Sequence, residues 1–218
     1  MSDVATSSSS SSSVFASSSD ALPGWFGKLP GMGDFAHRRL PESFRSVWDQ
    51  WLQRGLARLK DRHADWTAHY LEAPIWCFAL GPQVAGEGAW IGVLMPSVDG
   101  VGRYFPFTMA VELDVSVGEV LRGDALQVAL RWWSQGTRAA LEGLEGDLDA
   151  LRFDAVLQRV FVADVGDVRV GAVESLVLPG AGGSLWMGDP GAEETVRIVV
   201  AGLPLDGQFE ALFVGGGE

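Results

Sequence analysis

The sequence predicts a single α/β domain of the α+β kind, in which helices flank a central, mainly antiparallel mixed sheet. Three observations support this prediction. A helical pattern of apolar residues precedes a run of strand-like segments, further helical patterns follow that run, and the connections between the strands are short. Short connections favour antiparallel neighbours, because parallel strands need a long crossover between them.

The first half of the chain is expected to contain one strand and two helices. Trp25, Phe26 and Leu29 form a short apolar run that leads into a tight turn at 30–33, which predicts a strand. From Glu42 onward, apolar residues recur at three- and four-residue steps, which predicts a helix after Pro41. A shorter helix is predicted over 61–71, before Pro74. The buried stripe predicted for the first helix comprises Phe44, Val47, Trp48, Trp51, Leu52, Leu56 and Leu59.

The middle of the chain is expected to form a three-stranded meander. Residues 75–80, 89–95 and 104–113 are dense in aromatic and β-branched side chains, which favour strands. Glycine-containing turns separate them, so each strand is expected to run antiparallel to the next. The second and third strands are predicted to form a hairpin around the sequence PSVDGVGR.

Three further helices and two strands are expected in the remainder. One helix is predicted from Asp124, which has the spacing of a capping box with Gln127. Another is predicted from near Asp147. Residues 166–183 are rich in glycine and are left unassigned, whereas 184–187 and 195–201 predict strands. The predicted buried residues are Leu126, Leu130, Trp133, Thr137 and Leu141 in the first helix, Leu148, Leu151, Ala155 and Val162 in the second, and Phe209, Leu212 and Phe213 in a short closing helix.

Serine dominates the first twenty residues (MSDVATSSSSSSSVFASSSD). Such small polar side chains bury too little area to offset the entropy of ordering them, so residues 1–21 are predicted to be a disordered tail. The ordered domain is expected over 22–214, followed by a flexible C-terminus at 215–218. Phosphorylation of the tail would create a charge switch, although nothing around the serines specifies a kinase.

Composition excludes several classes of function. The 28 acidic residues outnumber the 16 basic ones in this chain of 218 residues, and the formal net charge is −12. A negative surface repels phosphate backbones, so we expect no nucleic-acid partner. The single cysteine, Cys77, fits a reducing compartment. No apolar run approaches the roughly 20 residues of a membrane helix, so we expect a cytoplasmic protein without direct membrane insertion.

The common catalytic and cofactor motifs are incomplete. Gly27 and Lys28 lack the other residues of a phosphate-binding loop, and no G-x-S-x-G sequence is present. Cys77 lies in an apolar strand pattern, where burial raises a thiol pKa. Asp65 and His69 stand one helical turn apart, a spacing that favours a solvated pair over a metal site. We therefore expect no catalytic residue, no metal and no cofactor.

Two glycine-rich segments carry charge between aromatic-rich strands. GKLPGMGDF contains Lys28 and Asp34, and PSVDGVGRYFP contains Ser97, Asp99 and Arg103. Such groups must be exposed or mutually satisfied, because unpaired burial is costly. They either brace the two turns through hydrogen bonds and an ion pair or line one recognition surface. The residues alone favour bracing and leave recognition open.

The same segments carry a resemblance to a known family. GWFGKLPGMGDF, WDQWL, WIGVLMPSVDGVGRYFP, SLWMG and AGLPLDGQFEALF, in this order, resemble the TagF (ImpM) family associated with bacterial type VI secretion systems. The resemblance covers about 24–213, and PSVDGVGRYFP is its most specific part. The serine tail and residues 152–183 depart from the family pattern.

The resemblance implies a non-enzymatic, cytoplasmic regulator that represses assembly of the secretion machine after translation. It implies partners, namely a forkhead-associated scaffold protein and components of the secretion complex. The expected partner-binding residues are Lys28, Asp34, Phe35, Ser97, Asp99, Arg103, Tyr104 and Phe105. The alternative is a small-ligand-binding or hydrolytic enzyme that uses Asp34 and Asp99 with Lys28 or Arg103 as an anion site, which requires one pocket to join the two carboxylates.

Overall fold

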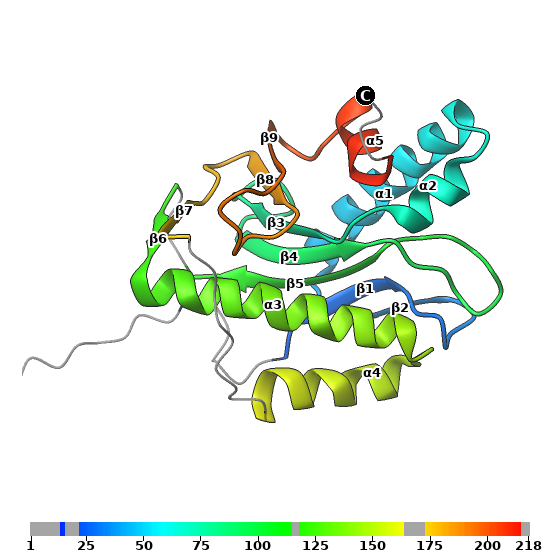
Figure 1. The fold of residues 1–218 in the computed structure, drawn as a ribbon, viewed down its shortest axis with the longest axis horizontal. Coiled ribbons are helices and arrows are strands. Elements are labelled where there is room, and N and C mark those ends of the chain that lie inside the picture. The colour runs from blue at the N-terminus through cyan, green and yellow to red at the C-terminus, as the bar shows by residue number, and fades with distance from the viewer. Residues whose placement is uncertain (1–13, 16–21, 115–117, 164–172, 215–218) are drawn as a thin grey trace, which may run out of the picture.

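A computed structural model describes residues 14–15, 22–114, 118–163 and 173–214. Its centre is a seven-stranded sheet with the strand order β2-β1-β5-β4-β3-β8-β9 (Figure 1). Every neighbouring pair in this sheet is antiparallel. The predicted α/β class with a mainly antiparallel sheet is confirmed. The elements in chain order are β1 (Gly24–Lys28), β2 (Phe35–Arg38), α1 (Glu42–Arg62), α2 (Trp66–Glu72), β3 (Trp76–Leu80), β4 (Ala89–Met95), β5 (Phe107–Leu113), β6 (Val120–Arg122), α3 (Gly123–Glu145), α4 (Ala150–Leu157), the π-helical segment η1 (Gln158–Ala163), β7 (Ser175–Val177), β8 (Gly183–Met187), β9 (Arg197–Ala201) and α5 (Gly207–Phe213).

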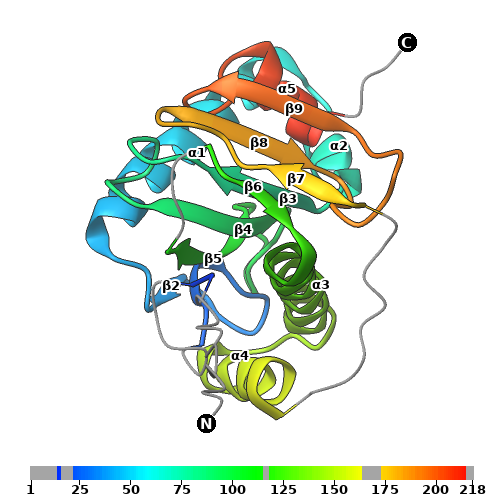
Figure 2. The ribbon, with the colours of Figure 1, turned by 90° about the vertical axis from the view of Figure 1, so that its left-hand side faces the viewer.

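Helices cover both faces of the sheet and create two hydrophobic layers (Figures 1 and 2). α3 and α4 pack on one face, where Trp133 and Phe153 join the core. α1, α2 and α5 pack on the other face, where Trp48 and Phe209 join a second cluster. Successive side chains of a strand point to opposite faces, so the strands between the helices supply both layers. This explains why β3 and β4 are buried along their whole length.

Tryptophan side chains tie the second layer together. The Trp48 ring centroid lies 4.8 Å from that of Phe78 in β3. Its indole N–H donates a 2.8 Å hydrogen bond to Thr108 Oγ1 in β5. Trp51, one turn further along α1, donates to the Pro204 carbonyl at 2.7 Å. Large rings supply apolar area while their N–H groups remain paired, so α1 is fixed against the sheet.

The strands of the meander were predicted well. β3, β4 and β5 are sequential antiparallel neighbours, and β4 and β5 form the predicted hairpin. The third strand begins at Phe107 and not at 104, because Pro106 cannot donate to a ladder and only an isolated bridge joins Val98 and Tyr104. β8, β9 and the closing helix α5 also lie where they were expected.

Three features of the region before β3 differ from the prediction. β2 was not predicted, because its four residues are partly exposed and lack a buried branched run. α1 continues to Arg62, so the second helix begins at Trp66 and not at 61. Val47 is exposed and does not belong to the buried stripe.

The predicted capping box of α3 is wrong. The N-cap residue is Arg122, no side chain caps the helix, and Asp124 lies within the first turn. The predicted stripe also included Leu141, which is exposed, while small residues such as Ala139 are buried. In the helix formed by α4 and η1 the prediction chose the wrong face, since Leu151, Ala155 and Val162 are exposed. The buried residues there are Phe153, Val156, Leu157 and Val160.

A second, two-stranded sheet joins β6 and β7. Neither strand was predicted, and β7 falls within the unassigned residues 166–183. Two residues of the expected serine-rich tail contact the domain: Val14 is buried, and Phe15 forms an antiparallel bridge with Leu113. Residues 1–13, 16–21 and 215–218, on which the remaining terminal predictions rest, lie outside the described residues.

Candidate functional site

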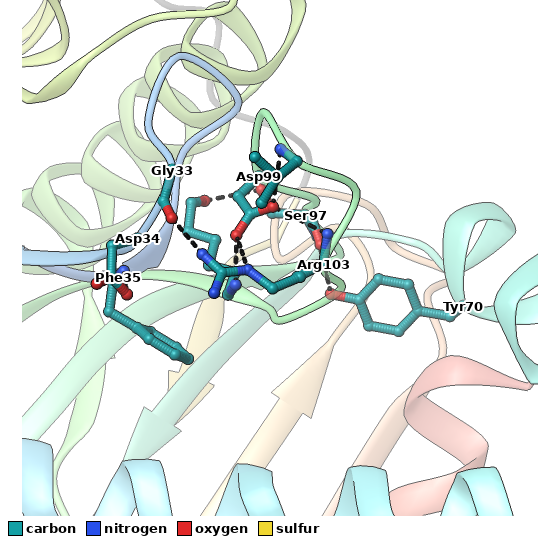
Figure 3. Close-up of polar contacts among 9 residues, drawn as sticks. Gly33, Asp34, Phe35, Tyr70, Ser97, Asp99 and Arg103 are labelled. Carbon is teal, nitrogen blue, oxygen red and sulfur yellow. Dashed lines mark hydrogen bonds and ion pairs between the residues drawn. The ribbon is translucent and has the colours of Figure 1, made fainter.

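The two glycine-rich segments meet at one end of β1. β1 pairs antiparallel with β5, so the end of β1 at Lys28 lies beside the beginning of β5. The first segment follows β1, and the second precedes β5, which brings both together (Figure 3). Gly27 makes the approach possible, because a Cβ on it would lie 2.3 Å from the Pro106 carbonyl oxygen and its φ is +131°.

Asp99 is the centre of this loop cluster, which we define as Lys28, Gly33, Asp34, Phe35, Tyr70, Ser97, Asp99, Val101, Arg103, Tyr104 and Phe105. The Asp99 carboxylate accepts four hydrogen bonds. Its Oδ2 lies 2.5 Å from Lys28 Nζ and 2.8 Å from Arg103 Nε. Its Oδ1 accepts from the backbone N–H groups of Val101 at 3.1 Å and Arg103 at 2.9 Å. The Asp99 side chain is 0% exposed and that of Lys28 is 4% exposed.

The charge of Asp99 is stabilised by these donors. Burial alone raises the pKa of a carboxyl, but hydrogen bonds from Lys28, Arg103 and Val101 outweigh it and hold the pKa of Asp99 well below its usual range. Asp99 is therefore an anion at neutral pH. A buried ion pair tolerates desolvation only when its hydrogen bonds are satisfied, as they are here.

Tyr70 in α2 fixes the second segment to the helical layer. Its hydroxyl accepts a 2.9 Å hydrogen bond from the Ser97 backbone N–H and donates one of 3.0 Å to the Ser97 carbonyl. Ser97 Oγ in turn donates to the Lys28 carbonyl at 2.8 Å. Burial raises the pKa of Tyr70 far above its usual range, so the hydroxyl keeps its proton. Sequence reasoning missed this role, because Tyr70 lies in the helix predicted over 61–71, outside both glycine-rich segments.

The outer side of the loop cluster is formed by Asp34, Phe35 and Arg103. Phe35 is 44% exposed, and its ring packs edge-on against Phe105 with 4.7 Å between the centroids. The Lys28 Nζ lies 4.9 Å from the same ring centroid, on its inner side. The Arg103 side chain is 53% exposed and donates to the Gly33 carbonyl as well as to Asp99. Asp34 is exposed and accepts from the Phe35 backbone N–H at 2.7 Å.

The predicted site residues therefore come together but divide into two groups. Lys28, Ser97, Asp99 and Phe105 are buried, and Tyr104 is half-buried against Trp66 and Tyr70. These buried residues hold the two turns together through hydrogen bonds and an ion pair. Asp34, Phe35 and Arg103 are exposed, so they are the ones that can contact a partner without unfolding the turns.

The geometry gives little support to the alternative anion site. A cavity of about 1020 Å³ lies between α3 and the turn after β8, and another of about 410 Å³ lies beside Pro30 and Ser97. Neither is lined by Asp34 or Asp99. The Cys77 thiol lines the larger cavity, but burial raises its pKa to about 12, so it is not an activated nucleophile.

The described residues contain neither a metal-binding cluster nor a membrane-spanning helix. No three His, Cys, Asp or Glu side chains there are grouped as a metal site requires. The exposed pair of Asp65 and His69 is joined at 3.1 Å as a simple helical contact. No helix in the part of the chain that the structure describes has the length and apolar character needed to cross a membrane.

The fold and the loop cluster define an α/β domain with an antiparallel sheet and a rigid, charged pair of turns at one end. The family described as the TagF N-terminal domain, type VI secretion system-associated, matches residues 24–160, which include both turns. The chain therefore belongs to the TagF family of type VI secretion-associated proteins, as the resemblance in the sequence predicted.

A solved structure supports the same fold. The crystal structure of PA0076 from Pseudomonas aeruginosa PAO1, at 2.05 Å resolution, is similar with a TM-score of 0.68 and 30% sequence identity. The similarity covers 90% of this chain and 96% of that chain. No curated protein sequence matches the chain.

Proposed function

We propose that this protein represses assembly of a type VI secretion system after translation. It does so in the cytoplasm by binding a forkhead-associated scaffold protein and components of the secretion complex, without catalysing a reaction. Membership of the TagF family supports the link to this secretion system. The main support for binding is that Asp34, Phe35 and Arg103 form an exposed side of the loop cluster.

Phe35 and Arg103 have the properties of interface anchors. Aromatic residues and arginine are enriched at the energetic centres of protein interfaces. Phe35 is held by Phe26 and Phe105, and Arg103 is held by Asp99 and the Gly33 carbonyl. Because both side chains are already ordered, a partner that binds them has less conformational entropy to remove.

The inner residues support binding over catalysis. The charges of Lys28 and Asp99 neutralise each other at 2.5 Å within the protein interior. A carboxylate whose pKa is so strongly lowered is a poor proton acceptor at neutral pH. The work of this ion pair is to hold the two turns in one arrangement.

The direct test measures binding of the purified scaffold protein from the same secretion system. Phe35→Ala and Arg103→Ala are expected to weaken binding by at least about tenfold, the effect of losing one anchor residue. Val177→Ala is the matched control, because Val177 is 61% exposed and lies on β7, in the separate two-stranded sheet. Normal affinity in both stably folded site variants would refute this surface as the binding site.

Repression itself requires a test in cells. Removal of the gene is expected to increase secretion through the type VI system, and the wild-type protein should restore the lower level. Phe35→Ala, produced at an equal amount, should fail to restore it. Unchanged secretion after removal of the gene would contradict the repressor role, whatever the outcome of the binding measurement.

A further inference from the structure

The two edge strands of the large sheet differ in how well they are protected. β2 has four residues, and Arg38 and its neighbour Arg39 both form ion pairs with Asp154, at 3.0 and 2.6 Å. Short length and charged side chains are common means of preventing an edge from pairing with another strand. β2 is therefore a protected edge.

β9 lacks this protection. Its five residues, RIVVA, contain one charge, and Figure 2 shows the strand as the last of the sheet, beyond β8. Val199 is 74% exposed, and Val196, just before the strand, is 66% exposed. An apolar edge strand without such ion pairs offers its backbone to a further strand, and natural proteins rarely leave one uncovered.

The hydrogen-bond pattern shows which backbone groups β9 offers. Gly188 N–H donates to the Val196 carbonyl, and Gly202 N–H donates to the Gly182 carbonyl. Bonded pairs alternate along an antiparallel ladder, so Ile198 and Val200 also direct their N–H and C=O groups toward β8. Arg197, Val199 and Ala201 direct theirs away from the sheet, and within the described residues no hydrogen bond reaches those groups.

We propose that β9 is the interface of a homodimer, in which two copies of this chain pair their β9 strands antiparallel about a two-fold axis at Val199. In this register Val199 lies opposite its own copy, Ile198 opposite Val200, and Arg197 opposite Ala201. It is the register that pairs the full length of both strands. The outward N–H and C=O groups of each copy are then all satisfied by the other copy.

A second copy fits this edge because the strand is complementary to itself. Arg197, the one charge in β9, meets the small side chain of Ala201, so no like charges oppose each other. Ile198, which packs against the tryptophan-rich layer, meets Val200 on the same face. A two-fold axis perpendicular to the sheet keeps corresponding faces together, so the tryptophan-rich layer that includes Ile198 continues across the junction.

The geometry also predicts that association stops at two copies. An isologous interface uses the β9 edge of both chains, and the edges that remain are the protected β2 strands. The net charge of −12 on each chain opposes association. Salt screens this repulsion, so the dimer is expected to become tighter as NaCl is added.

Light scattering coupled to size-exclusion chromatography tests the proposal on the full chain. Between about 1 and 200 µM, which brackets affinities typical of modest interfaces, the dimer fraction should rise with concentration. Added NaCl should raise it further. A monomer throughout this range would refute the proposal, and so would a ladder of larger assemblies, because the proposed pairing is closed.

Two variants locate the interface. Val199→Pro removes an outward N–H and leaves the β8 ladder intact, and Val199→Lys places two like charges opposite each other. Each should raise the dimer dissociation constant at least about tenfold. The control is Leu151→Lys on α4, with 73% exposure against 74% for Val199. Circular dichroism verifies folding, and a dimer as tight in Val199→Lys as in the wild type would contradict the β9 interface.

Discussion

The inner and outer sides of the loop cluster contain similar residue types and have opposite environments. Lys28 and Asp99 form a buried pair, and the Asp99 carboxylate accepts four hydrogen bonds. Asp34 and Arg103 are charged as well, but they are exposed. The difference teaches that a charged, glycine-rich motif need not have a single role, because its buried members can hold the shape that its exposed members present.

The largest expected effect comes from breaking the buried pair. Asp99→Ala leaves the Lys28 ammonium buried without a partner, which typically costs about 3–5 kcal/mol. The free energy of unfolding, measured by urea denaturation, should fall by that amount. Asp34→Ala is the matched control on the outer side and should change it by less than about 0.5 kcal/mol. Equal losses in the two variants would remove the distinction between inner and outer residues.

The pH dependence of stability should report the same pair. The fold holds the pKa of Asp99 below its unfolded value of about 3.9, so the stabilisation is complete above that value and is lost as the pH falls toward the folded pKa. The free energy of unfolding of the wild type should therefore exceed that of Asp99→Asn by a constant amount from pH 7 to 5, and this difference should shrink below about pH 4. An advantage that does not change down to pH 2 would contradict this role.

The difference in stability between the wild type and Asp99→Asn reports the titration of Asp99 and not that of the other carboxyl groups. Burial raises the pKa values of Asp154 and Glu210, but hydrogen bonds from Arg39 and Arg62 outweigh it and lower both. These two groups also lose stabilisation in acid. Because they are the same in the wild type and in Asp99→Asn, their contribution cancels in the difference.

A smaller loss of unfolding free energy is expected when the hydrogen bonds between Tyr70 in α2 and Ser97 are removed. Tyr70→Phe leaves the Ser97 backbone N–H and carbonyl buried without their partner, which costs about 1–3 kcal/mol. Urea denaturation measures the change. Tyr104→Phe, which removes the other tyrosine hydroxyl of the chain from a half-buried ring, is the control and should lose less. The reverse order would show that Tyr70 does not brace the turn.

The smallest effect on stability is expected on the outer side. Phe35→Ala removes a ring that is 44% exposed, so the expected loss is about 1 kcal/mol, below that of any buried phenylalanine. Phe44→Ala in α1, whose side chain is 0% exposed, should lose about 3–5 kcal/mol. Thermal denaturation of the two variants gives the comparison, and similar losses would mean that Phe35 is part of the core.

Much of the fold follows from periodic burial in the sequence. β3, β4 and β5 were predicted because buried strands with short turns leave a strong local pattern. β2 was missed because an exposed edge strand has no such pattern. The faces of α3 and α4 were partly misassigned because tertiary packing buries small residues such as Ala139 and leaves Leu151 exposed.

The candidate site was predictable as a location and only partly as an arrangement. Charges on two glycine-rich turns identified two segments that the structure brings together. The pairing of Lys28 with Asp99 joins residues 71 positions apart, and it follows from the register of β1 with β5, which local sequence does not reveal. Tyr70 comes from a third segment, so no motif within the turns could indicate it.

The central claim is that inner residues hold the fold while outer residues bind the partner. The most direct test measures the unfolding free energy and the affinity for the forkhead-associated scaffold protein on the same samples of Tyr70→Phe and Phe35→Ala. The account predicts that Tyr70→Phe is the less stable variant and binds normally where it is folded, whereas Phe35→Ala loses at least about tenfold in affinity. Normal affinity in Phe35→Ala, or an equal loss of affinity in both, would contradict it.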